Sequence, residues 1–179
     1  IHKEMYLEIE NVKAVYGTFH KDEMAQCIME GRTPGDQVNS DFRSFTFDNL
    51  SISKGKHEAR SYIKIQDGCD NFCSYCIVPY SRGRSRSRNH QSIMEEMKRL
   101  LDNGVKEIII GGIDVGSYED PHEEKAYRLK NLLREMAEYA PEKHFRIRVS
   151  SIECSQIDDE YISLFHDYPN RLCPHFHIP

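Results

Sequence analysis

The pattern of hydrophobic and polar positions becomes regular from Ser61 onward, where strand-like and helix-like segments alternate. Residues 61–65 alternate apolar and polar side chains, which predicts a strand that ends before Gly68. Residues 107–112 and 145–153 predict two further strands, and residues 172–179 predict a last one. Between them, apolar residues recur at helical spacing over 92–103, 129–136 and 157–165.

This order predicts an α/β fold with a parallel sheet and right-handed crossovers. Ser92 and Glu95 fit a capping box at the start of the first helix, and Gly104 is expected to end it. Functional residues of such sheets gather at the carboxyl ends of the strands. Cys69, Gly111–Gly112 and Ser150–Glu153 each follow a strand, so we expect them to meet on one edge.

The first 60 residues have a weaker pattern. Residues 11–18 predict a short strand that runs into a turn at Gly17, and a helix with Cys27 on its apolar face is expected to end at Gly31. Cys27 is interpreted as a small buried side chain. Residues 31–42 are polar and rich in turn formers, as is typical of a linker.

Composition limits the class of protein. The chain has 179 residues and 39 % hydrophobic residues, which is enough for a packed core. It contains no apolar run of about 18 residues and no signal-peptide pattern, so we expect no membrane segment. Its six cysteines are not spread as in a disulfide framework, which favours a reducing, cytoplasmic location. Because it begins with Ile1 and stops after an apolar run, we expect a fragment of a longer protein.

Charge is distributed unevenly. The net charge is −5, yet residues 54–88 hold eight Lys or Arg against three acidic residues, a local +5 that leaves −10 elsewhere. A basic segment in an acidic chain indicates a local anion site or a contact with a polyanion. A solvated loop is the simpler alternative.

Three cysteines are concentrated in eight residues of this segment. Cys69, Cys73 and Cys76 have the spacing C-x3-C-x2-C. Structural zinc prefers four ligands, so a zinc site would need Cys154 or Cys173 as a fourth. Three thiolates on a short loop suit three corners of an iron–sulfur cube and leave one iron open for a ligand. The sequence therefore favours an iron–sulfur site over zinc.

The cysteine loop, with Tyr75 before the last cysteine, resembles that of radical S-adenosylmethionine (SAM) enzymes. The string "GCDNFCSYCIVPYSRGRSRSR", together with "GGIDVGSY", "RVSSIE" and "PHFHIP", is similar to the methylthiotransferase branch. The resemblance implies a partial (β/α) radical SAM barrel, about four of six βα units, at residues 59–179. It also implies a remnant of the α/β amino-terminal methylthiotransferase domain at 1–34 and a linker at 35–58.

The resemblance assigns roles to residues by position. Cys69, Cys73 and Cys76 would ligate a [4Fe-4S] cluster whose open iron binds SAM, which is then cleaved to a radical that attacks adenine C2. The expected SAM contacts are Tyr75, Ile77, Gly111, Gly112, Ser150, Ser151 and Glu153. The acidic residue usual after the two glycines is replaced here by Ile113.

Within the branch, the motifs are most like the bacterial enzyme that methylthiolates N6-threonylcarbamoyladenosine at position 37 of tRNA. Alternatives are the enzyme for isopentenyladenosine in tRNA, the enzyme for a ribosomal-protein aspartate, or a non-enzymatic iron–sulfur or zinc module that binds RNA. The implied partners are the tRNA anticodon loop, not DNA, and a flavodoxin- or ferredoxin-like electron donor.

Alternation predicts that Arg82, Arg84, Arg86 and Arg88 line one side of an extended segment. We expect the first two near the site and the last two on RNA, and one of His175 and His177 facing the barrel interior near the substrate. The resemblance also implies a second [4Fe-4S] cluster, with ligands in a part of the family that this chain lacks. We therefore expect this chain alone to be incompetent for methylthiolation.

Overall fold

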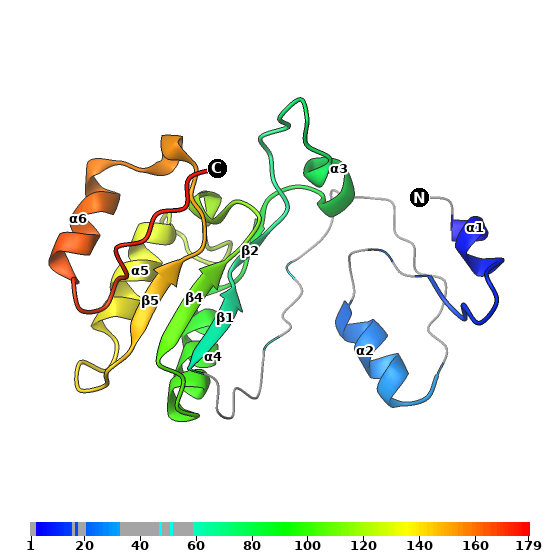
Figure 1. Ribbon diagram of the computed structural model, residues 1–179, viewed down its shortest axis with the longest axis horizontal. Coiled ribbons are helices and arrows are strands. Elements are labelled where there is room, and N and C mark those ends of the chain that lie inside the picture. Colours follow the sequence, from blue (N-terminus) through cyan, green and yellow to red (C-terminus); the bar gives the residue numbers. More distant parts are fainter. Residues whose placement is uncertain (1–2, 16, 18–20, 33–46, 48–50, 52–58) are drawn as a thin grey trace.

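The computed structural model describes residues 3–15, 17, 21–32, 47, 51 and 59–179. From residue 59 onward, strands and helices alternate as the hydrophobic pattern predicts (Figure 1). The elements of this part are β1 (Arg60–Lys64), β2 (Gln66–Asp67), α3 (Val78–Arg82), β3 (Arg86–Ser87), α4 (His90–Asp102), β4 (Glu107–Gly111), η1 (Val115–Ser117), α5 (Leu129–Glu138), β5 (Arg146–Val149), η2 (Cys154–Gln156) and α6 (Asp159–Asp167).

The main sheet has the strand order β1-β4-β5 and is parallel throughout. Ile63 pairs with Ile110, and Ile110 pairs with Val149, so the carboxyl ends of the three strands lie level. Helices α4 and α5 connect these strands and lie together on one face of the sheet (Figure 1). This confirms the α/β fold class with a parallel sheet.

The hydrophobic core lies between the sheet and these helices. Helix α4 presents Ile93, Met97, Leu100 and Leu101 at helical spacing, and all four are buried. Alternate strand residues such as Ile63 and Ile108 meet them with no exposed surface. Helices α5 and α6 add Leu132, Leu133, Met136, Tyr161 and Leu164 to the same cluster.

The opposite face of the sheet is polar. Tyr62 of β1 is 61 % exposed, and Glu107 of β4 forms ion pairs with Arg60 and Arg148 from the two neighbouring strands. Parallel sheets are normally covered on both faces. A polar face that remains open is what a partial barrel presents at its interior.

Two expected features of this region are wrong in detail. Helix α4 begins at His90, two residues before the expected start, because the side chain of Asn89 accepts a hydrogen bond from the Ser92 amide at 3.1 Å. Residues 172–179 do not form a strand, since a single parallel bridge joins Leu172 to Ile147. The fourth strand position of the barrel is therefore marked by one bridge.

The described amino-terminal residues contain two helices, α1 (Lys3–Leu7) and α2 (Lys21–Met29). Helix α2 and the burial of Cys27 are confirmed, and Gly31 ends the helix at φ +66°. The strand expected at residues 11–18 is wrong for residues 11–15, which form no ladder, while 16 and 18–20 lie outside the described residues. Most of the expected linker also lies outside them. Among the described residues, no helix is both long and apolar enough to span a membrane.

Candidate iron–sulfur and SAM site

A two-stranded ribbon sets up the loop that carries the cysteines. β2 pairs antiparallel with β3, with Gln66 opposite Ser87 and Asp67 opposite Arg86. Residues 68–85, here called the cysteine loop, therefore leave the carboxyl end of β1 and return to it. All three clustered cysteines and helix α3 lie within this loop (Figure 1).

Gly68 is required where the two ends of the cysteine loop cross. Its φ is +72°, and a Cβ atom built on it would lie 2.0 Å from the carbonyl oxygen of Arg84. The crossing is closed by the Cys69 amide, which donates to the carbonyl of Gly83 at 3.2 Å. A residue without a Cβ is therefore needed at position 68.

The three thiols of the loop interact with one another. Cys69 and Cys76 are half-buried, Cys73 is exposed, and none of the six cysteines, all of which are described, forms a disulfide. Burial raises the pKa of Cys69, and negative charge on Asp114, Cys73 and Cys76 raises it further. The Asn71 amide donates to the Cys69 sulfur at 3.4 Å.

The donor set is three cysteine thiols on one short loop, which is the kind of set that holds an iron–sulfur cluster. Within the described part of the chain, no three His, Cys, Asp or Glu side chains are placed to share one metal ion. Outside the triplet, Cys154 is exposed and Cys173 is buried.

The loop after β4 packs directly against the base of the cysteine loop. A Cβ atom on Gly112 would lie 3.1 Å from three atoms of Gln66, so glycine permits this close approach. Ser151 and Glu153, which follow β5, line a small cavity of about 20 Å³ together with Ile113 and Asp114. The structure therefore brings the ends of β4 and β5 together beside the cysteine loop, as the strand connectivity predicts.

Asp114 connects the three loops at this edge. Its carboxylate accepts from Asn71 of the cysteine loop at 3.2 Å and from Gln156, beyond β5, at 2.8 Å. The residue is only 8 % exposed. Sequence reasoning noted that Ile113 replaces an acidic residue and overlooked the acid at the next position, which the string "GGID" contained.

A polar cavity of about 830 Å³ lies against this edge. Asp70 and Asn71 of the cysteine loop line it, together with Asp114 and Gln156 from the loops after β4 and β5. Arg86 and His122 add basic groups to the wall. A cavity of this volume, with converging polar groups, can hold a nucleoside-sized ligand.

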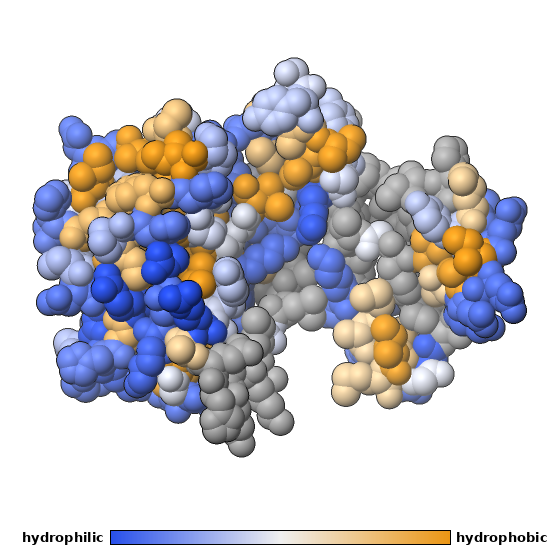
Figure 2. All heavy atoms as spheres, in the orientation of Figure 1, coloured by the Kyte–Doolittle hydropathy of each residue, from blue (hydrophilic) through white to orange (hydrophobic). Residues whose placement is uncertain are grey.

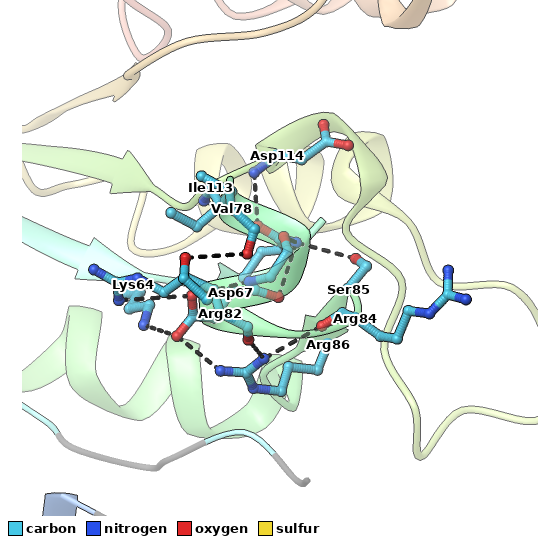
Figure 3. Close-up of polar contacts among 12 residues, drawn as sticks. Lys64, Asp67, Val78, Arg82, Arg84, Ser85, Arg86, Ile113 and Asp114 are labelled. Atoms are coloured by element: carbon cyan, nitrogen blue, oxygen red, sulfur yellow. Dashed lines mark hydrogen bonds and ion pairs between the residues drawn. The ribbon is translucent and has the colours of Figure 1, made fainter. Parts of the chain in front are cut away.

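The four arginines do not form one row, which corrects the expectation of an extended ladder. Arg82 ends helix α3, where the chain is not extended, and Figure 3 shows Arg84 pointing away from the Asp67 carboxylate that Arg86 faces. The Arg86 side chain is 10 % exposed and contacts Asp67 at 3.0 Å. The Arg88 side chain is 3 % exposed and is ion-paired with buried Glu96.

The expected contact of Arg88 with RNA is therefore wrong, since its guanidinium group is buried and paired, and Arg86 is paired with Asp67 and lines the cavity instead of the outer surface. Burial alone would raise the pKa of Asp67, but Lys64, Arg86 and the Gly68 amide together lower it, so the carboxylate stays charged beside them. Arg82 and Arg84 remain 40 % and 61 % exposed at their side chains.

The cysteine loop exposes a group of apolar side chains. Tyr75 is 90 % exposed and Ile77 is 70 % exposed, so neither lines a closed pocket within the described residues. Figure 2 shows hydrophobic residues gathered over α3 and this loop. The negative charge of nearby Cys73 and a hydrogen bond to it raise the pKa of Tyr75, so its ring stands beside the thiols.

The two histidines near the end of the chain are both exposed. The His177 carbonyl accepts from the Ile152 amide at 3.1 Å, which holds this segment next to the end of β5. His175 lines a cavity together with Glu107 and Arg148 on the open polar face of the sheet, which fits the expectation that one of the two faces the barrel interior. A role of His175 and His177 near a substrate stays a prediction.

Comparison with known proteins agrees with this geometry. A family model described as "Radical SAM superfamily" matches residues 63–179. The chain belongs to the radical SAM superfamily. This superfamily member is similar to a radical SAM methyltransferase, TsrM, from Kitasatospora setae, with a TM-score of 0.56 at 21 % identity over 84 % of this chain and 33 % of that one. At such identity the likeness shows the fold alone.

Its sequence relatives are methylthiotransferases, which confirms the resemblance to that branch. It is 36 % identical over 97 % of its length to the threonylcarbamoyladenosine tRNA methylthiotransferase MtaB of Bacillus subtilis. It is 40 % identical over 66 % of its length to a tRNA-2-methylthio-N(6)-dimethylallyladenosine synthase of Phocaeicola vulgatus. The chain spans 38 % and 25 % of the lengths of these two relatives.

Proposed function

We propose that the full-length protein is a radical SAM enzyme that adds a methylthio group to C2 of N6-threonylcarbamoyladenosine at position 37 of tRNA. One observation carries this proposal. Cys69, Cys73 and Cys76 lie on one loop at the carboxyl edge of a parallel sheet, and Asp70 and Asn71 of the same loop line a cavity of about 830 Å³. This is where α/β sheets bind their ligands.

The residues present fit a [4Fe-4S] cluster with SAM at its open iron. Cys69, Cys73 and Cys76 would hold the cluster, which when bound supplies the electron for reductive cleavage of SAM. A flavodoxin- or ferredoxin-like protein would supply that electron. The second cluster is likewise proposed for the full-length protein only.

The chain's own residues bind, orient and shield the ligand. The Asn71 amide orients the Cys69 sulfur, and Gly112 lets the loop after β4 pack closely against Gln66 at the base of the cysteine loop. The proposed SAM contacts at Tyr75, Ile77, Ser150, Ser151 and Glu153 lie on the same edge of the sheet. An ordered site of this kind fixes the reacting groups and excludes water.

We place the RNA contact on the exposed part of the cysteine loop. The Arg84 guanidinium lies 4.7 Å from the centre of the Phe72 ring, and the Tyr80 ring lies 5.6 Å from the same ring. Arg84 is 61 % exposed at its side chain and Tyr80 is 62 % exposed. Aromatic rings beside arginine bind unpaired bases and phosphates, as an anticodon loop offers.

Sequence similarity favours the threonylcarbamoyl substrate over the isopentenyl one by a small margin. Over nearly the whole chain, the identity is 36 % to a threonylcarbamoyladenosine enzyme and 33 % to a dimethylallyladenosine synthase. A tRNA substrate also implies a cytoplasmic location.

Mass spectrometry of tRNA nucleosides from a deletion strain tests the function. We expect loss of the methylthio group from threonylcarbamoyladenosine and its return with the full-length gene. Cys73→Ala should fail to restore it, whereas Cys154→Ala, at an exposed cysteine outside the triplet, should succeed. Loss from isopentenyladenosine instead would assign the other tRNA substrate. Unchanged tRNA would reject both.

The RNA surface is tested separately by binding. Arg84→Glu in the full-length protein should weaken tRNA binding and reduce the slope of log affinity against log salt by about 1. Arg134→Glu is the matched control, since this arginine is 39 % exposed on α5, on the helical side of the sheet. Equal effects of both variants would mean that charge alone, not this surface, governs binding.

A further inference from the structure

Gln66 is a fully buried polar residue at the junction of the two loops that form the candidate site. It lies in β2, directly after β1, and has 0 % exposed surface. A buried amide is costly unless its donor and acceptor atoms are satisfied. Its side-chain amide has five hydrogen-bond contacts, of which two go to the cysteine loop, two go to the loop after β4, and one goes to Asp67 in β2.

The nitrogen of the Gln66 side chain holds the cysteine loop. Nε2 donates to the Gly68 carbonyl at 2.7 Å and to the Asp67 carbonyl at 3.1 Å. It also lies 3.0 Å from Ser85 Oγ, at the other end of the same loop. One amide group therefore holds both ends of the segment that carries the cysteines.

The oxygen of the same amide holds the loop after β4. Oε1 accepts from the Asp114 amide at 2.8 Å and from the Ile113 amide at 3.0 Å. Figure 3 shows Ser85, Ile113 and Asp114 within one cluster of polar contacts. Gly112 completes the contact, because a Cβ atom there would lie 3.1 Å from Gln66 and would press on it.

We propose that Gln66 is a positioning residue that fixes the distance between the cluster-bearing loop and the SAM-bearing loop. The proposal rests on the proposed function for the identity of the two ligands. Cys69 follows Gly68, which the Gln66 nitrogen holds, and the loop held by its oxygen carries Gly112 and Asp114. A shift of either loop would separate the open iron from the groups that SAM contacts, without removing any ligand.

The two ends of the amide can be altered separately. Gln66→Glu keeps an oxygen for the Ile113 and Asp114 amides but replaces the donor that faces the carbonyls of Asp67 and Gly68. Gln66→Met has a similar shape and removes all five hydrogen bonds. Gln91→Glu makes the same chemical change at an exposed residue of α4 and is the matched control.

Hydrogen exchange of the full-length protein without its cluster tests the link itself. Gln66→Glu should speed exchange of the Cys69 amide and leave the Ile113 and Asp114 amides near wild type. Gln66→Met should speed exchange in both loops. The proposal is overturned if neither variant differs from Gln91→Glu, or if exchange rises equally throughout the sheet.

SAM titration of the reconstituted protein tests the consequence. The paramagnetic resonance signal of the reduced cluster reports SAM binding, and we expect roughly tenfold weaker binding for Gln66→Met with wild-type iron and sulfide content. Leu132→Ala, in the buried face of α5, controls for loss of stability. Equal weakening by Leu132→Ala would overturn the positioning role.

Hydrogen exchange and SAM titration together distinguish a failure of the proposed function from a failure of the positioning role of Gln66. If the wild-type cluster does not respond to SAM, the proposed function fails, while the exchange result still decides whether Gln66 connects the loops. If wild type responds and Gln66→Met binds SAM equally well, the positioning role alone is wrong.

Discussion

The helical side of the sheet and the cysteine loop are held together in different ways. Beneath the sheet, residues such as Ile93, Met97 and Leu132 have no exposed surface and pack into one apolar cluster. In the cysteine loop, Tyr75 and Ile77 are 90 % and 70 % exposed, and order comes from hydrogen bonds at the base of the loop. The helical layer is stabilised by burial of its apolar side chains. The cysteine loop is held by hydrogen bonds at its two ends, and its apolar side chains stay exposed.

The contrast shows where stability and function are separable. Apolar burial contributes most to folding, so changes in the helical layer should lower the free energy of unfolding. The exposed side chains of the loop contribute little to that free energy, so changes there should alter ligand binding instead. Residues at the base of the loop, such as Gly68 and Arg88, belong to both regions.

The largest difference should separate two arginines four residues apart. Arg88→Ala removes the buried ion pair with Glu96, whose side chain is 2 % exposed, and should lower the free energy of unfolding by about 3–5 kcal/mol. Arg84→Ala breaks an exposed pair with Asp70 and should cost less than about 1 kcal/mol. Urea unfolding followed by circular dichroism measures both. Similar losses would contradict the burial difference.

A comparison of two aliphatic truncations tests the regions directly. Leu132→Ala in α5 opens a cavity in the core and should lower the free energy of unfolding by about 2–5 kcal/mol. Ile77→Ala, at a residue that is 70 % exposed, should stay within about 0.5 kcal/mol of wild type. The same unfolding titration suffices. If Ile77→Ala lowers the free energy of unfolding as much as Leu132→Ala does, the cysteine loop is stabilised by apolar packing and not by the hydrogen bonds at its base.

Two glycines with positive φ differ in what surrounds them. Gly68→Ala adds a clash with the Arg84 carbonyl to backbone strain, so we expect a cost of about 1–3 kcal/mol and a loss of bound iron. Gly104→Ala, at φ +94° with no heavy atom near the new Cβ, should cost about 1 kcal/mol and keep the iron. Iron analysis after reconstitution distinguishes them. Normal iron in Gly68→Ala would mean that the loop can close elsewhere.

The smallest expected change in the free energy of unfolding concerns Asp120, whose carboxylate accepts a hydrogen bond from the His90 amide at the start of α4. Burial alone would raise its pKa, but the His90 and His122 amides and the His90 ring lower it below the ordinary value. Its stabilisation is therefore present above about pH 4 and is lost as the pH falls through the folded pKa. Asp120→Asn should cost about 1–2 kcal/mol at pH 7, with the difference shrinking in acid. Urea midpoints at pH 7, 5 and 3.5 measure it, and a constant difference would contradict it.

The sequence predicted those parts of the fold that depend on local patterns. Helices α4, α5 and α6 were predicted from apolar residues at helical spacing. The short spacing of the three cysteines was enough to predict that they lie on one loop. The arginines were misplaced because the alternation along residues 82–88 does not reveal that this segment turns back and pairs with β2. Such pairing depends on residues far apart in the sequence, and so do the contacts of Gln66 with Ser85, Ile113 and Asp114.

The last expected strand shows the same limit. Residues 172–179 have a strand-like composition, yet a strand needs a neighbour with which to exchange hydrogen bonds over several residues. Here Leu172 and His177 each contact the β5 segment at a single point. Local composition suggested a strand here but could not show whether the segment finds a pairing partner.

The β2–β3 ribbon makes the cysteine loop a removable unit. Both ends of the loop meet at one short pair of strands, so residues can be inserted between them without shifting the parallel sheet. Transplanting residues 69–82 from a homologue should therefore preserve the scaffold, provided that the glycine at the crossing and the glutamine below it are kept. Diversification of substrate could proceed in this way while the barrel itself changes little.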